Sequence, residues 1–446
     1  MRWRKPANRA FVQAAITAFH EEPEQGFAQL SKLPVKAWTT SDYWLETSGL
    51  ALYFYDLLCR RSMLDLVPDT TRAQLRSNLH KNRRRTKALF REFVALNESF
   101  SEREISYANY KGFTLCPHAS PHPELRHQLD LDFLVASADL PAARRCLEER
   151  GYSLSAATPK TWEFKAGNDL GRKRWDNYTM GTYRSVELHF GIYRTAHDRL
   201  TIDERLLRLS TWTWQGKAFP SLSAQDQLIG QALHLFSHFR NESTRLSWLL
   251  EFRRHVCSRH DDAGFWRQII SLAGTNRDAP IAFGLSILIT SKVFGRFAPP
   301  AVETWALESV PTTIRSWADR YGVEAVLADF PGTKLYLLLE AQLELLEGRP
   351  PLAMRTRLFP IRRMGSCFSR ATAESVPDKL RCHVRTVKFA LFRLRFHATQ
   401  ALRIAIELPQ WTRLLRKCAG YHSHVTAARE MTNRKQVDDK FSAPPR

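Results

Sequence analysis

LDLDFLV, residues 129–135, predicts a β-strand whose two faces differ in chemistry. Side chains alternate between the two faces of a strand, so its four large apolar residues at odd-numbered positions would share one face. Asp130 and Asp132 would then lie together on the other face. The apolar face is typical of a strand packed into a core, and the two neighbouring carboxylates need a separate explanation.

A bound divalent cation is one explanation for the two aspartates. Same-face neighbours on a strand lie about 6–7 Å apart, so ionised carboxylates there repel each other and lose solvation where the sheet is covered. A cation reverses this cost, and Mg²⁺ favours one or two carboxylates together with substrate phosphates. A half-exposed edge strand with a solvated polar face is the alternative, because a short Asp-x-Asp pattern alone is weak evidence.

A second predicted strand, SVELHFGIY at 185–193, repeats the pattern. Glu187 and His189 would share one face, which offers a third carboxylate near the aspartates. Three carboxylates are typical of sites in which two cations about 3.5–4 Å apart hold the attacking and leaving oxygens of a phosphoryl transfer. For His189, a place beside the metal ligands is favoured over direct ligation, and a purely polar strand face is the alternative for Glu187.

Upstream residues suggest where phosphates would bind. Lys111 and Gly112 end the predicted strand ISYANYKG. Glycine lets the backbone approach a phosphate, and lysine adds a positive charge. Arg126, four residues before Asp130, offers a guanidinium fork that suits a phosphate. An ordinary turn and a surface arginine are the alternatives for these residues.

Taken in order, these features resemble a known family. The resemblance rests on four runs in the same order: YKGFTLC, HPELRHQLDLDFLV, DLPAARRCLEERGY and SVELHF. They resemble the uncharacterised nucleotidyltransferase family of the DNA polymerase β-like superfamily. The later runs LSAQDQLIGQALHLFSHF, RLSWLLEF and TRLFPIRR extend the resemblance, which covers about residues 45–400.

The resemblance implies an α+β fold, with a polymerase-β-like mixed sheet flanked by N-terminal and C-terminal helical regions. Asp130 and Asp132 would bind Mg²⁺ or Mn²⁺, and Glu187 would be the third carboxylate of a site for two ions. Glu187 would also help to deprotonate the acceptor hydroxyl. The reaction would be attack of this hydroxyl on the α-phosphorus of an NTP, with pyrophosphate leaving.

The resemblance also places Lys111, Gly112 and Arg126 at the triphosphate. Better-characterised branches of the superfamily carry Gly-Ser at a helix start before the aspartates, and this chain has Lys111-Gly112-Phe113 instead. The way the phosphates are held is therefore less well defined than the metal site. The acceptor, whether protein, peptide, RNA or small molecule, is not implied.

The distribution of helical and β-rich patterns divides the chain into four predicted regions. These are an N-terminal helical region (1–100), a nucleotidyltransferase α/β core (101–215), a helical bundle (216–350) and a basic helical C-terminal region (351–446). The core would contain four or five strands, NYTMG at 177–181 among them, and one helix with Asp139 as N-cap and Gly151 just beyond its end. The tail from about 422 to 446 is expected to be disordered.

Two histidines, His234 and His238, are spaced i, i+4 and would share one face of a bundle helix. No third ligand accompanies them, so hydrogen-bonded structural histidines are favoured, and residues lining a substrate cleft are the second interpretation. Of the basic runs, HKNRRRTK (80–87) is interpreted as a solvated helix face, and LGRKRW (170–175) as a contact for a polyanionic acceptor.

The charge of the chain suggests anionic partners. Its 66 Lys and Arg against 45 Asp and Glu give a formal charge of +21, which favours nucleotides, nucleic acid or an anionic membrane. Residues 381–417 contain nine Lys and Arg and the single acid Glu407, and for this segment a membrane surface, nucleic acid and solvent all stay open.

A cytoplasmic location is expected. The seven cysteines are scattered and form no C-x-x-C pair, as in proteins of a reducing compartment. The longest apolar run, APIAFGLSILIT at 279–290, is shorter than the roughly 20 residues of a membrane span. Peripheral attachment to a membrane is the alternative.

Two functional hypotheses follow from the residues and the resemblance. The first is a metal-dependent nucleotidyltransferase that uses an NTP and an unidentified acceptor. The second is a catalytically inactive module that binds a nucleotide or RNA on the same fold. Retention of all three carboxylates favours the enzyme, because a degenerate site has no need to keep costly acids.

Overall fold

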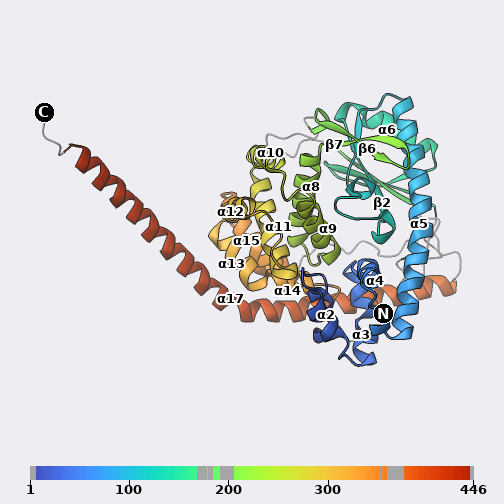
Figure 1. Cartoon of the computed structure of the whole chain (residues 1–446), viewed down its shortest axis with the longest axis horizontal. Helices are drawn as coiled ribbons and strands as arrows, with labels where there is room; N and C mark the ends of the chain where they lie inside the picture. The colour runs from blue at the N-terminus through green and yellow to red at the C-terminus, as the bar shows by residue number, and fades with distance from the viewer. Residues whose placement is uncertain are drawn as a thin grey trace. The chain divides into compact units, whose positions relative to one another are not determined.

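The computed structural model describes residues 7–167, 178, 184–190, 205–351, 353–358 and 376–441 (Figure 1). The basic run LGRKRW lies outside the described residues, and so does the expected strand NYTMG apart from Tyr178. Of the TRLFPIRR run, the structure describes residues 356–358 only.

The first hundred residues are helical, as the sequence predicts. The helices are α1 (Arg9–Thr17), α2 (Glu24–Leu30), α3 (Val35–Thr47), α4 (Ala51–Arg60) and the long α5 (Asp69–Glu102). The extended backbone of Pro68 separates α4 and its following turn from α5, because proline fixes φ and has no N–H to continue a helix.

A mixed seven-stranded sheet follows, in the spatial order β3-β4-β5-β2-β1-β7-β6. Its strands are β1 (Tyr107–Asn109), β2 (Asp130–Val135), β3 (Ser153–Ala157), β4 (Thr161–Ala166), β5 (Arg184–His189), β6 (Leu209–Trp214) and β7 (Lys217–Leu222). The strands β2 and β5 run parallel, as do β1 and β7, and the other neighbours are antiparallel. The α+β class and the mixed sheet are thus confirmed.

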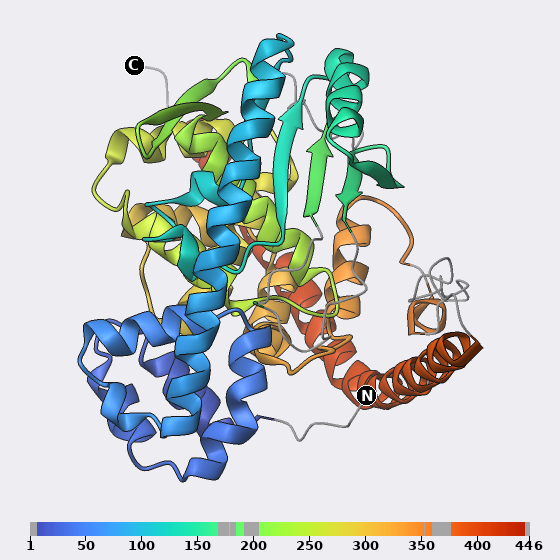
Figure 2. The same cartoon turned by 90° about the vertical axis from the view of Figure 1, so that its right-hand side faces the viewer.

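The alternation predicted for LDLDFLV is present in β2. Leu131, Phe133 and Val135 are buried in the main core of the sheet, which also contains Phe93 of α5 and Leu147 of α6 (Leu140–Glu149). Figure 2 shows α5 crossing over one face of the strands. The opposite face of β2 therefore carries Asp130 and Asp132 on the side that α5 and α6 leave uncovered.

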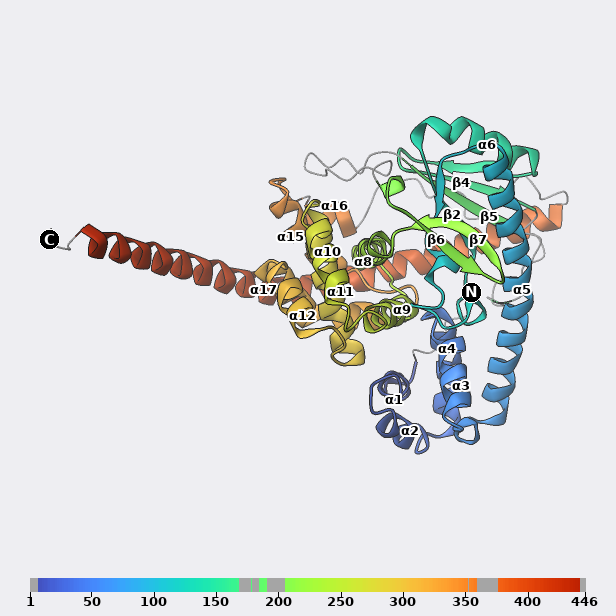
Figure 3. The same ribbon diagram turned by 45° about the horizontal axis from the view of Figure 1, so that its top comes forward.

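A second group of helices lies on this other side. The sheet is followed by α8 (Ala224–Phe239), α9 (Leu246–Cys257), α10 (Ala263–Ala273), α11 (Asp278–Phe294) and α12 (Pro300–Glu308). Figures 1 and 3 place α8 and α9 on the side of the sheet away from α5. The start of α8 is set by Ser223, whose hydroxyl accepts a hydrogen bond from the backbone N–H of Asp226, a standard helix cap.

The described residues form two compact units. The larger unit contains the described residues of 7–310 and 323–332, and so includes the sheet, the helices named above and α14 (Val323–Leu327). The smaller unit contains residues 311–322 and the described residues from 333 onward. Its helices are α13 (Thr312–Trp317), α15 (Tyr336–Leu346), α16 (Met354–Leu358) and α17 (Val376–Phe441). The first two predicted regions and most of the third thus belong to one unit.

The structure differs from the sequence-based expectations in three places. The strands β3, β6 and β7 were not predicted, because their short runs carry exposed residues on both faces or lie beyond the expected core. Asp139 is the N-cap residue of α6, as expected, but its side chain makes no capping hydrogen bond, since its carboxylate accepts from the backbone N–H of Ser106 instead. Gly151 does follow the helix, with φ of +79°.

The third difference concerns the C-terminal tail, which was expected to be disordered. Helix α17 continues to Phe441. Residues 421–441 contain neither glycine nor proline, so no residue in this stretch interrupts the helical hydrogen bonds.

Two observations bear on the expected location. Among the described residues, no helix is long and apolar enough to cross a membrane. The described cysteines Cys59, Cys116, Cys146, Cys257 and Cys418 are all free.

Candidate active site

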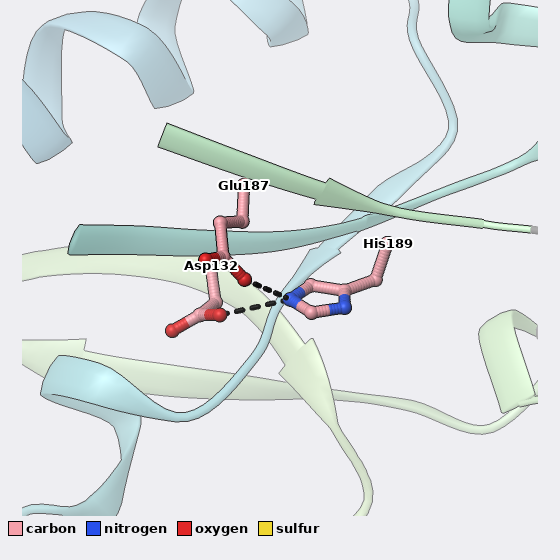
Figure 4. A group of neighbouring side chains, drawn as sticks. All are labelled: Asp132, Glu187 and His189. Atoms are coloured by element: carbon pink, nitrogen blue, oxygen red, sulfur yellow. Dashed lines mark hydrogen bonds and ion pairs between the residues drawn. The ribbon is translucent and has the colours of Figure 1, made fainter. Parts of the chain in front are cut away.

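The register of the two central parallel strands brings the predicted carboxylates together. Asp132 of β2 is paired with Glu187 of β5. Both side chains point to the same sheet face, and His189, two residues further along β5, joins them there (Figure 4). One ligand atom from each of the three residues lies within 4.8 Å of the others.

His189 connects the two carboxylates. Its Nε2 lies 2.8 Å from Asp132 Oδ1 and 3.4 Å from Glu187 Oε2, while its Nδ1 lies 3.3 Å from the Thr161 hydroxyl. Burial lowers the pKa of His189, but the hydrogen bonds to the two carboxylates outweigh it and raise the pKa above its usual value. His189 therefore bridges the two acids through its Nε2.

Lys111 is the second cation at these acids. Its Nζ lies 3.4 Å from Asp132 Oδ1 and 4.7 Å from the centre of the Tyr110 ring. Burial lowers the pKa of Lys111, but the nearby carboxylates, Asp132 foremost, raise it above its usual value. The ammonium group is thus fully charged at neutral pH.

The backbone at Lys111 is strained. Its φ of +59° and ψ of −150° fall in a region that is almost exclusive to glycine. Gly112 also has positive φ, +55°, and a Cβ there would lie 2.6 Å from Gln128 Nε2. The Lys111-Gly112 pair is thus a tight, unusual backbone segment, and the lysine side chain reaches Asp132.

Asp130 and Asp132 are two residues apart on one strand face, yet their pKa values shift in opposite directions. Burial, followed by the charges of Asp132 and Glu187, raises the pKa of Asp130 to about 6. Burial acts in the same sense on Asp132, but the Lys111 ammonium and the His189 hydrogen bond outweigh it and hold the pKa well below its usual range. The local positive charge therefore balances the negative charge of ionised Asp132, but it balances that of Asp130 only in part.

Opposite effects on stability follow for the two aspartates. The folded-state pKa of Asp130 is raised from 3.8 to about 6, so its ionisation destabilises the fold as pH rises through this window. Above pH 6, Asp130→Asn is expected to stabilise the cation-free protein by up to about 3 kcal/mol, at about 1.4 kcal/mol per pKa unit. The measurement is urea unfolding in EDTA over a pH series, where this gain should vanish toward pH 4.

Asp132→Asn is the matched comparison in the same experiment. The lowered pKa of Asp132 contributes stability that is present above its unfolded-state value and is lost on acidification. This variant should therefore be less stable than the wild type at neutral pH. If the free energy of unfolding at neutral pH changed in the same direction in both variants, the opposite pKa shifts assigned to the two aspartates would be contradicted.

Arg126 pairs with a buried acid. Its Nε lies 3.1 Å from Glu251 Oε2 on α9, and both side chains are largely buried. The other oxygen of Glu251 accepts from the Tyr53 hydroxyl of α4 at 2.8 Å. Burial lowers the pKa of Arg126, but Glu251 raises it above its usual value. The predicted phosphate-binding arginine is thus held by a network that joins α4 and α9.

The predicted histidines of α8 form a cluster with an aromatic residue. His234 and His238 have ring centres 4.6 Å apart, and both contact the Trp248 ring of α9. Burial and then the Lys111 charge lower the pKa of each, that of His238 to about 4. Both are neutral imidazoles at neutral pH, and they are not among the described groups that could hold a metal ion.

Sequence reasoning did not single out Arg245, which lies just before α9. Its guanidinium contacts the His127 ring and stacks over Trp248. Burial lowers its pKa, and Asp130 is the foremost charge that opposes this shift. Arg245, Trp248 and Glu251 all lie in RLSWLLEF, where two charged residues six positions apart within a largely apolar run were the available signal.

The acids fit a divalent cation. Asp132 is ionised, Glu187 lies opposite it, and carboxylate oxygens are the ligands that Mg²⁺ and Mn²⁺ prefer. His189 offers an imidazole nitrogen within the same 4.8 Å. Asp130 is not part of this group in the described residues, so the geometry accounts for one cation.

Comparisons with known proteins identify the family of the chain. No curated protein matches the chain. An antigenic nucleotidyltransferase-like protein from Paracoccidioides brasiliensis aligns over 47% of this chain and 93% of its own, with 14% identity and a TM-score of 0.27, too low to support an argument. The family model of the uncharacterised nucleotidyltransferases matches residues 34–293, more than half of the chain and the whole sheet with its acids. The chain therefore belongs to the uncharacterised nucleotidyltransferase family.

Proposed function

We propose that the protein transfers a nucleoside monophosphate from an NTP to an acceptor hydroxyl and releases pyrophosphate. The observation that carries the proposal is the parallel register that sets Asp132 opposite Glu187, with His189 bridging them. Opposed carboxylates on neighbouring strands can hold a cation against the phosphates of a nucleotide. Family membership supports the same reaction class.

Asp132 and Glu187 would hold Mg²⁺ or Mn²⁺, and Asp130 would complete a site for a second ion. The bound cation would polarise the α-phosphate and neutralise the charge that develops there. Glu187 is more exposed than Asp132, at 29% against 7% of the side chain. We therefore assign Glu187 to the acceptor side, where it would accept the proton of the attacking hydroxyl.

The positively charged residues near the acids would bind the triphosphate. Lys111, Gly112 and Arg126 keep this proposed role, and Arg245 joins them because it is half-buried and lies within electrostatic reach of Asp130. Lys111 neutralises Asp132 in the cation-free protein. When a metal ion bound by Asp132 balances the charge of this carboxylate instead, the Lys111 ammonium becomes available to a phosphate oxygen. A compact point charge is suited to that contact.

An inactive nucleotide- or RNA-binding module is the second candidate. It is favoured by the finding that Lys111 and His189 already satisfy Asp132 without a metal. It is disfavoured by Asp130, whose raised pKa shows that the local cations do not compensate all of the acids. A site without a metal has no physical reason to keep such a carboxylate.

Label transfer distinguishes the two candidates. The purified protein, alone and with cell lysate, is incubated with each α-³²P-labelled NTP and Mg²⁺ or Mn²⁺, beside an EDTA sample and the Asp130→Asn/Asp132→Asn variant. Label on a macromolecule or small molecule, absent with EDTA and in the variant, is the expected result and identifies the acceptor class. Metal-independent nucleotide binding that the variant retains, with no transfer, would favour the binding module.

A further inference from the structure

The long helix α17 has one face that packs within its own compact unit. Phe396, Ile404 and Trp411 are buried on this face. Glu407, also on this face, accepts hydrogen bonds from Arg320 and from the hydroxyl of Tyr321. These residues recur at three- and four-residue spacing and form one stripe along the helix.

The opposite face of α17 is apolar and exposed. Its large side chains are Val384, Val387, Leu391, Leu394, Leu402, Ile406 and Leu408, each 38–65% exposed. Val384 to Leu394 follow a three-four-three spacing, so they lie in line on one side of the helix. This exposed stripe spans 25 residues, or about 37 Å at 1.5 Å per residue.

Such a stripe indicates a binding surface. Single exposed aliphatic residues are common on soluble proteins, but a continuous apolar stripe flanked by polar residues marks an interaction site. No helix in the described part of the chain can span a membrane. The stripe is therefore suited to contact along the helix and not to insertion across a bilayer.

Positive charge accompanies the exposed stripe. Lys388 and Arg395 are exposed one turn after Val384 and Leu391, and Arg413 is exposed beyond its end. The segment 381–417 has nine Lys and Arg but only one acid, Glu407, and that acid is already paired with Arg320. The surface is thus both apolar and cationic.

We propose that the exposed stripe of α17 binds the surface of an anionic membrane. An interfacial helix buries an apolar face among the acyl chains while its Lys and Arg contact anionic headgroups. Nucleic acid would satisfy the cations but leave seven aliphatic side chains without a partner. A second copy of the segment 381–417 would bring its cations together with Glu407 as the one acid in the segment, which is already paired with Arg320.

Vesicle co-sedimentation of the full chain tests the proposal. Vesicles of phosphatidylcholine alone are compared with vesicles that also contain phosphatidylserine, at low and high salt. We expect binding to the anionic vesicles that weakens with salt. In Leu391→Ser/Leu394→Ser, binding should weaken on the order of tenfold or more, because two exposed apolar side chains no longer enter the interface.

The chain provides a matched control. Leu207 and Leu209 are exposed in the larger unit, at 84% and 48%, so Leu207→Ser/Leu209→Ser removes the same side chains elsewhere and should bind like the wild type. The proposal is overturned if the full chain does not bind anionic vesicles, or if both double variants bind equally. It is also overturned if the α17 variant loses only self-association, or only binding to duplex DNA or RNA. None of these readouts depends on the proposed transferase activity.

Discussion

Asp132→Asn is expected to reduce nucleotidyl transfer by about a thousandfold or more while the protein stays folded. Asparagine keeps the size of the side chain but removes the charge that holds a cation opposite Glu187. Electrostatic stabilisation by a metal ion is worth several kcal/mol, and each 1.4 kcal/mol is a factor of about ten in rate. The measurement is the initial rate of label transfer at saturating NTP and Mg²⁺.

Asp261→Asn is the control for this result. It makes the same chemical change on a carboxylate that is 99% exposed and remote from the sheet strands in the sequence, so transfer should be unchanged. Circular dichroism would show that both variants are folded. A folded Asp132→Asn variant that keeps a rate within a few-fold of the wild type would refute the assigned role of this carboxylate.

Loss of the buried Arg126–Glu251 pair is expected to have the largest effect on stability. Glu251→Ala leaves the largely buried Arg126 charge without its carboxylate, and the Tyr53 hydroxyl keeps only Ser120 as a hydrogen-bond partner. Removing one partner of a buried ion pair costs about 3–5 kcal/mol, because the remaining charge is uncompensated. Chemical unfolding should therefore show a lower midpoint with an unchanged dependence on denaturant.

A surface pair provides the comparison for Glu251. Glu98 pairs with Lys217, and both side chains are more than half exposed. Glu98→Ala should lower the free energy of unfolding by less than about 1 kcal/mol, because water screens an exposed pair. If Glu98→Ala and Glu251→Ala lowered the free energy of unfolding equally, the Tyr53–Glu251–Arg126 network would not be the structural connection between α4 and α9.

Such a network would also influence nucleotide binding if Arg126 contacts phosphate. Glu251 fixes the arginine by its Nε, so it is a positioning residue in the proposed site. Tyr53→Phe removes one hydrogen bond from Glu251 and keeps the ring. This milder variant separates the positioning role from the loss of stability, because it should raise KM for the NTP without unfolding the protein.

Much of the central sheet could be predicted from the sequence. The period-two alternation of LDLDFLV and SVELHF follows from strand geometry alone, and β2 and β5 are where it predicts. Helix α6 and the position of Gly151 could also be predicted, because the residues that mark the start and end of a helix are local in sequence. The strand β3 escaped prediction because all five of its residues are exposed, so it carries no apolar pattern.

The candidate site was predicted as a set of residue types but not as a set of contacts. Asp130, Asp132 and Glu187 share one sheet face, as expected, and Asp132 and Glu187 are opposite each other. The strand alternation could not show that Lys111 and His189 bind Asp132 in preference to Asp130. That choice depends on the strained Lys111 backbone and on the β2–β5 register, which are long-range features.

By itself, the sequence determined the local elements and the kinds of chemistry available, because strand and helix periods and charge content depend only on neighbouring residues. Tertiary structure alone decided how two identical carboxylates differ. Burial raises the pKa of Asp130, while Lys111 and His189, distant in the chain, hold that of Asp132 low. The physical reason is that solvation and Coulomb interactions depend on distances in space, which no local pattern specifies.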